Sequence, residues 1–217
     1  VEGTVARTDL SPLQGKKAFP NRKGRLVEPS SLFSVDDAAL VNQFSDLDDH
    51  LLMSGDGVGE ITAVFNIKPL SQAVKLHIVD GLNAVEAMSI QKQIANRRPL
   101  IDRLLQAEMK PGEKSFNAAF LANVRVLKLP ELNIQYWLTI DGRTLKTEPE
   151  AVSVKFDSAV NILYLEDIPS WAMISRELAI AIKGSRAVGG LAIGIKEVLS
   201  ADTFGKASRI LDELGYM

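Results

Sequence analysis

The sequence predicts an α+β fold, in which a helical N-terminal part is followed by an antiparallel β-meander of about four strands and by C-terminal helices. Apolar residues recur at helical spacing up to about residue 107. Past residue 110 their period changes from about 3.6 to 2, and after Pro169 it returns to the helical value. We therefore predict an extended basic leader over residues 1–33, a mainly helical subdomain over residues 34–110, and the meander with the C-terminal helices over residues 111–217.

The first sixty residues form a basic block and then an acidic one. Residues 1–30 carry six Lys or Arg against three acidic residues, whereas residues 31–60 carry seven acidic residues and no Lys or Arg. Three Gly and three Pro in the first block predict an extended, wrapping or connecting segment. Adjacent blocks of opposite sign favour pairing with each other, or with other parts of a parent chain, over a binding site.

Three helices are predicted before residue 110. The first covers residues 38–52, is capped by Ser34, and turns its acidic residues to solvent. A Gly-rich stretch ends it, and Pro69 starts a second helix that runs to residue 79. The third covers residues 84–107 and contains Pro99, which is expected to kink or split it.

Four strand-like runs follow, over residues 121–129, 134–140, 151–156 and 160–165. Asp141-Gly142 predicts a tight hairpin because this pair tolerates positive φ at both central positions. A second hairpin is expected at Asp157-Ser158.

Three helices are predicted near the C-terminus. Ser170 caps the first, a second covers residues 191–199, and Asp202 or Thr203 caps a third that ends at Gly215.

Composition excludes several classes of protein. The chain has no cysteine, which excludes disulfides, thiolate nucleophiles, Cys-ligated zinc and iron–sulfur clusters. No apolar run approaches the ~20 residues that span a bilayer, so we expect no membrane partner. We also predict an intracellular, cytoplasmic location. A net charge of −2 produces no whole-molecule field that would attract nucleic acid.

The candidate motifs point away from catalysis. His50 and His77 have no partner at metal-ligand spacing. The loop from Gly55 to Gly59 lacks the Lys-Ser or Lys-Thr of a phosphate-binding loop. A second Gly cluster predicts close helix packing, at Gly184, Gly189, Gly190 and Gly194. We therefore predict no catalytic, cofactor-binding or metal-ligating residue, and no cofactor.

Two alternatives stay open from the residues. In the first, the chain contacts nucleic acid through a basic helix face, made of Lys92, Arg97, Arg98 and Arg103. In the second, the chain is an enzyme whose loop carboxylates converge in space, with Asp56, Glu60 and Asp141 as candidates.

Short motifs along the chain together resemble the region downstream of the GHKL-type ATPase domain in sacsin-like and NO VEIN-like large proteins. They include Ile67-Lys68-Pro69-Leu70-Ser71, Ile162-Leu163-Tyr164-Leu165, Arg176-Glu177-Leu178-Ala179 and Lys196-Glu197-Val198-Leu199. The resemblance implies a module of a larger ATPase with a chaperone-like or defence role. The resemblance implies no ATP site in this chain. The family's ATP-binding loop has the pattern Asp-x-Gly-x-Gly, and in Asp56-Gly57-Val58-Gly59 each Gly lies one position too early.

The N-terminus, Val1-Glu2-Gly3-Thr4, has neither an initiator Met nor a signal pattern, which is typical of an excised piece. Together with the resemblance, this favours a non-catalytic interaction or coupling module. Its partner would be another protein or the remainder of a larger parent chain.

Overall fold

The computed structural model describes residues 11–44, 47–55, 58–79, 81–108, 118–167, 169–184 and 188–216. Predictions that involve Asp46, Asp56, Gly57 or residues 109–112 lie outside these described residues. The chain forms two compact units: unit 1 comprises Val1–His77 and Gln135–Glu148, and unit 2 comprises Ile78–Ile134 and Pro149–Met217. This division differs from the predicted boundaries. The predicted boundaries were placed where the spacing of apolar residues changes, whereas strand pairing joins residues 135–148 to the N-terminal part of the chain.

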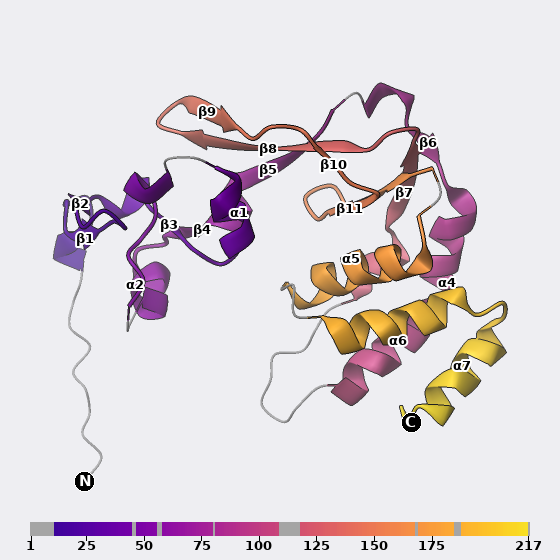
Figure 1. Ribbon diagram of the computed structural model, residues 1–217. Coiled ribbons are helices and arrows are strands. Elements are labelled where there is room, and N and C mark those ends of the chain that lie inside the picture. The colour runs from indigo at the N-terminus through magenta and orange to yellow at the C-terminus, as the bar shows by residue number, and fades with distance from the viewer. Residues whose placement is uncertain are drawn as a thin grey trace, which may run out of the picture. The chain divides into compact units, whose positions relative to one another are not determined.

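Unit 1 combines short helices with small sheets (Figure 1). Its helical elements are η1 (Ser11–Leu13), η2 (Pro29–Ser31), α1 (Ala38–Gln43), η3 (Leu47–Asp49), α2 (Val58–Val64) and α3 (Leu70–Ala73). Its strands are β1 (Phe19–Pro20), β2 (Leu26–Val27), β3 (Phe33–Ser34), β4 (Lys68–Pro69), β9 (Arg143–Lys146) and most of β5 (Val74–Val79) and β8 (Asn133–Ile140). The pair β1–β2 is antiparallel and β3–β4 is parallel, while β8 pairs with β5 and, antiparallel, with β9.

The core of unit 1 consists of two clusters of buried apolar residues. One holds Phe19, Leu32, Leu52 and Ile67. The other holds Leu40, Phe44, Leu47, Leu51, Leu70, Leu138 and Ile140. Phe19 and Leu32 come from the predicted extended leader, so this part of the chain is built into the core.

The basic and acidic blocks pair with each other, as predicted. Lys23 Nζ lies 2.6 Å from Asp49 Oδ2, and Arg25 Nη1 lies 3.5 Å from Asp49 Oδ1. A longer contact of 3.9 Å joins Arg22 to Asp48. Opposite charges of the two blocks therefore form local ion pairs within unit 1.

Two helix predictions in unit 1 are wrong in extent or type. The predicted helix over residues 38–52 ends at Gln43, because Phe44 adopts an extended conformation, and its cap is Asp37 rather than Ser34. The predicted second helix covers only Leu70–Ala73, after which the chain forms strand β5. Pairing with β8 stabilises the strand there.

Unit 2 packs four helices with a second four-stranded sheet (Figure 1). Its helical elements are η4 (Gly81–Asn83), α4 (Met88–Glu108), η5 (Ala119–Ala122), α5 (Trp171–Lys183), α6 (Gly189–Ser200) and α7 (Phe204–Glu213). Its strands are β6 (Val85–Glu86), β7 (Arg125–Leu129), β10 (Glu150–Ala151), β11 (Val154–Asp157) and β12 (Ile162–Glu166). The order in the four-stranded sheet is β11-β12-β7-β6, and β10 pairs with the first two residues of β8.

The α+β class is confirmed, and both predicted hairpins form antiparallel pairs, β8–β9 and β11–β12. The predicted strands nevertheless belong to two sheets rather than to one meander. Strand β12 pairs with β7 in parallel, from Ile162 opposite Arg125 to Glu166 opposite Leu129. The reason is that the chain leaves β7, forms the β8–β9 hairpin and β10–β11, and then returns beside β7 in the same direction.

The C-terminal helices begin where their caps predict. The hydroxyl of Ser170 accepts a hydrogen bond from the backbone N–H of Met173, and that of Thr203 accepts one from Lys206. After α7, Gly215 has φ of 82°, a left-handed conformation that glycine adopts without steric cost. Of the two effects expected of Pro99, a kink or a split, the split does not occur, since α4 continues through this residue.

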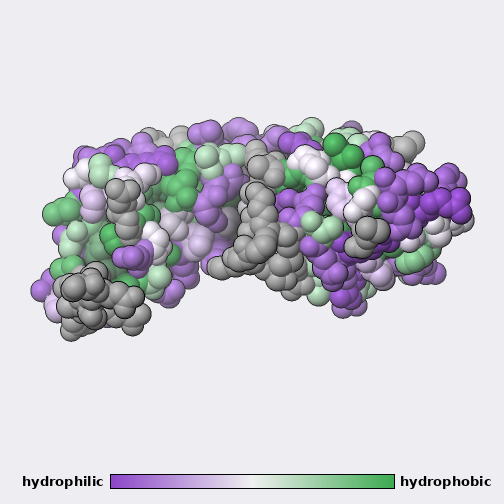
Figure 2. Space-filling view, turned by 90° about the horizontal axis from the view of Figure 1, so that it is seen from below, coloured by the Kyte–Doolittle hydropathy of each residue, from purple (hydrophilic) through white to green (hydrophobic). Residues whose placement is uncertain are grey.

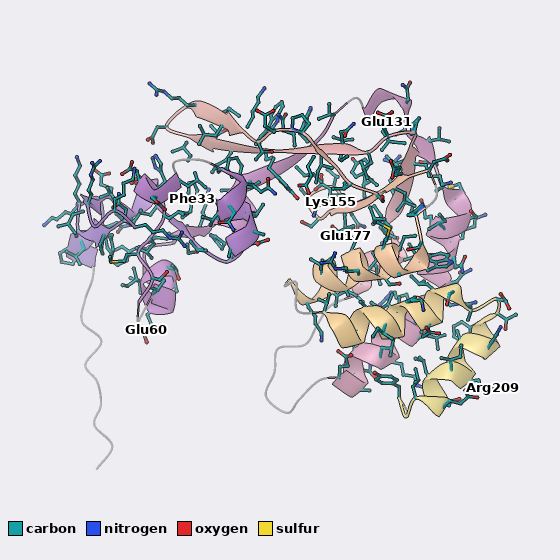
Figure 3. All side chains as sticks on the ribbon, in the orientation of Figure 1. Phe33, Glu60, Glu131, Lys155, Glu177 and Arg209 are labelled. Carbon is teal, nitrogen blue, oxygen red and sulfur yellow. The ribbon has the colours of Figure 1, made fainter. Side chains whose placement is uncertain are left out.

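Helices α4 and α6 pack closely at a glycine, as predicted for the Gly cluster. A Cβ placed on Gly194 would lie 3.0 Å from Leu104 Cδ2, so the absence of a side chain allows this contact. An ion pair joins strand β11 to helix α5: Lys155 Nζ lies 3.0 Å from Glu177 Oε1 (Figure 3). The same carboxylate oxygen accepts a hydrogen bond from the backbone N–H of Phe156.

Candidate functional site

The outward face of the β5–β8–β9 sheet gathers polar and aromatic side chains in unit 1. Side chains alternate between the two faces of a sheet. Leu138 and Ile140 of β8 are buried in the core, so the residues between them point the other way. The resulting outward set, which we call the Trp137 face, consists of Lys75, His77, Gln135, Trp137, Thr139, Thr144 and Lys146.

Trp137 stands at the centre of this face with its ring held by neighbours. The ring of His77 on β5 stacks on it, with centroids 4.3 Å apart and an angle of 23° between planes. Lys146 lies directly opposite on β9 and places Nζ 4.2 Å from the indole centroid, in cation–π geometry. The indole N–H donates to Gln135 Oε1 over 2.7 Å. These contacts fix the indole in one orientation.

The charges of the Trp137 face are of one sign. None of its seven side chains is acidic, and two of them are lysines. Within the part of the chain that the structure describes, neither Lys75 nor Lys146 forms an ion pair. Thr139 and Thr144, whose hydroxyl oxygens lie 3.2 Å apart, add hydrogen-bonding groups. The face therefore combines cations, hydroxyls and aromatic rings on one surface.

The β8–β9 hairpin holds this face in register. Asp141 and Gly142 form its turn with φ of 49° and 75°, the two positive values predicted for this pair. The turn places Trp137 opposite Lys146 and Thr139 opposite Thr144.

The structure does not bring the four predicted nucleic-acid contacts onto one face. At about 100° per residue, Arg97 and Arg98 lie more than 100° around α4 from Lys92. Arg98 Nε lies 3.2 Å from Asp102 Oδ2, and Arg103 pairs with Asp212 of α7. Lys92 is exposed.

Arg97 is buried in unit 2, with 7% of its surface exposed. Its Nη2 donates to the backbone oxygen of Ala201 over 3.1 Å, just past the C-terminus of α6, and its guanidinium lies over Phe204. Nearby, Gln93 Nε2 donates to the backbone oxygen of Leu199 over 2.6 Å. Arg97 therefore caps a helix, where its charge complements the helix dipole.

A cavity of about 380 Å³ lies elsewhere in unit 1 and brings together Asp141, His50 and Asp49. Its other lining residues are Lys17, Asn21, Arg25, Val27, Glu28 and Ser31. Of the predicted loop carboxylates, only Asp141 lines it: Glu60 lies in α2, and Asp56 is outside the described residues. His50 Nδ1 lies 3.3 Å from the backbone oxygen of Ser31, which orients the ring.

Among the described residues, two groups have clearly shifted pKa values, and both shifts point away from neutral pH. The hydrogen bond from Lys23 lowers the pKa of Asp49 below its usual 3.8. Burial, with the nearby charge of Asp157, raises the pKa of Tyr164. At neutral pH these groups therefore stay charged and neutral, respectively.

Asp49→Asn is expected to lower the melting temperature at pH 7, because it removes the ion pairs with Lys23 and Arg25. The lowered pKa means that Asp49 stabilises the fold above pH 3.8 and that this contribution is lost as the pH falls further. Melting curves from pH 7 down to about pH 2.5 should show the two proteins converging at the acid end. A constant difference over that range would contradict this role.

Exposed apolar side chains are spread over many elements, including Leu26 of β2, Val64 of α2 and Ile193 of α6. On the face that Figure 2 shows, hydrophobic residues lie among hydrophilic ones. Apolar surface therefore does not single out a docking site there.

Across the described ranges, no cluster of three or more His, Asp or Glu residues is placed to hold a metal ion. Among the helices of that same part of the chain, none combines the length and apolar character needed to span a bilayer. No protein-family model, curated protein or solved structure matches this chain.

Proposed function

We propose that this chain is a non-catalytic interaction or coupling module that binds its partner through the Trp137 face. The observation that carries the proposal is the outward face itself, with a fixed indole, no carboxylate and two lysines that form no ion pair with any described residue. Such an arrangement offers a partner rigid aromatic contact area and charge complementarity without ordering many side chains on binding.

The proposal includes the parent protein. The chain would act as part of a larger intracellular GHKL-type ATPase with a chaperone-like or defence role, next to or partnered with the remainder of that protein. Support comes from the motifs that resemble sacsin-like and NO VEIN-like proteins. Leu163 and Leu165 of β12, Leu178 of α5 and Leu199 of α6 are all fully buried. These motif residues belong to the core of unit 2, whereas the Trp137 face is formed by other residues.

Magnesium-ATP is expected to leave the melting temperature of the purified chain unchanged, because no nucleotide site is part of this proposal. A ligand that binds the native state raises the melting temperature, by an amount set by its concentration relative to Kd. Thermal unfolding with and without millimolar nucleotide is therefore the measurement. A saturable increase, or ATP hydrolysis that copurifies with the chain through several columns, would contradict the non-catalytic part of the proposal.

A further inference from the structure

We infer that the Trp137 face binds single-stranded nucleic acid; this rests on the proposed function, since it names the partner of the same face. Single strands are recognised by aromatic side chains on which unstacked bases lie, combined with cations that track the phosphates. The face holds both features on adjacent strands.

The ring geometry suits a stacked base. One side of the His77 ring lies against Trp137, and the side chain of His77 is nevertheless exposed. A base that stacks on the outer side of His77 would therefore extend a stack that the protein has already begun. Because Trp137 backs the imidazole and is itself held by Gln135, the platform is fixed before the ligand arrives.

The cations lie where the phosphates of such a strand would run. Lys146 occupies β9 on one side of Trp137, and Lys75 lies on β5 two residues before His77, on the same face. No ion pair occupies either lysine in the described residues, so no salt bridge has to break; Lys146 would move from its cation–π contact with Trp137 to reach a phosphate. Of the Thr139 and Thr144 hydroxyls, one donates to the other, so the pair leaves one further donor beside the lysines.

The chemistry favours a single strand over two other polyanions. A duplex hides its base faces within the stack, so the rings of this face would contribute nothing. An acidic polypeptide would satisfy the lysines and leave the stacking surface of His77 without a partner. A strand with accessible bases uses both.

Binding is tested by fluorescence anisotropy of a labelled oligothymidylate of about 12 nucleotides, at low and moderate salt. We expect it to bind more tightly than a duplex of the same length. His77→Ala should weaken binding by roughly 5- to 150-fold, the range that corresponds to about 1–3 kcal/mol for loss of one stacked base. Lys75→Gln with Lys146→Gln should also reduce the slope of log affinity against log salt by about 1.4, for two phosphates on a single strand.

Matched controls come from exposed cations of unit 2. Lys92→Gln with Arg209→Gln removes the same charge from α4 and α7 and should leave affinity and salt slope unchanged. If these substitutions weaken binding as much as those on the sheet, the site assignment is wrong. Lys146→Arg should retain binding, and melting temperatures of all variants establish that they fold.

A labelled polyglutamate serves as the second probe and separates the two proposals. If it binds, and the sheet variants weaken it while the oligonucleotide does not bind, the face is an interaction surface but the inferred partner is wrong. If neither probe binds at low salt, both the inference and the surface assigned to the proposed function fail.

Discussion

Leu163→Ala should lower the free energy of unfolding of unit 2 by about 2–5 kcal/mol, the largest effect we expect from a single substitution. Leu163 lies in β12, is fully buried, and belongs to the cluster that packs the sheet against α4–α7. β12 is an inner strand of its sheet, between β11 and β7. Truncation there removes buried apolar surface and leaves a cavity that the paired backbone cannot easily fill.

Amide hydrogen exchange in β7 and β12 at increasing urea concentrations measures this loss within unit 2. Val160→Ala is the control, because Val160 lies in the loop before β12 with 54% of its surface exposed. Its effect should stay within about 0.5 kcal/mol. Equal effects of the two substitutions on the free energy of unfolding would show that Leu163 of β12 does not contribute to the core as described.

Arg97→Ala should cost about 2–3 kcal/mol, because it removes buried packing and leaves the Ala201 carbonyl without its donor. Arg97→Met separates these two contributions, since methionine fills much of the volume but cannot donate. The methionine variant should therefore recover part of the loss. Arg97→Lys should not restore the wild-type value, because an ammonium lacks the planar guanidinium that lies over Phe204.

The free energy of unfolding is again measured in urea, with Arg209→Ala as the control. Arg209 lies in α7 and is exposed (Figure 3), so its removal should change stability by no more than about 0.5 kcal/mol. If Arg97→Ala behaves like this exposed control, Arg97 does not act as a buried cap.

Features set by neighbouring residues were predictable from sequence. Asp141-Gly142 determines its turn through local backbone preference, and Ser170 and Thr203 cap helices through hydroxyls three residues from their donors. Strand β5 depends on a distant partner instead. Its alternation from Val74 to Val79 was a usable signal, but a helix start at Pro69 precedes it, and pairing with β8 decides the outcome.

The candidate site could not be predicted from the sequence, because it too depends on pairing between strands that are distant in the chain. His77 and Trp137 are sixty positions apart, and only the alignment of β5 with β8 brings their rings together. Arg97 is an error of the opposite kind. The helical pattern placed it on a basic face and predicted that it would be exposed, but it is buried. It is covered by residues around Ala201, about a hundred positions later, which helical periodicity cannot report.

The interrupted course of unit 1 has a consequence for the order in which the chain is made. Leu138 and Ile140 belong to the same cluster as Leu40, Leu51 and Leu70, but Ile78–Ile134 is synthesised between them. On the ribosome, the first part of unit 1 therefore waits with an unfilled apolar surface until β8 emerges. At that stage the exposed apolar surface favours premature association with other chains, and it is the surface that a chaperone would bind.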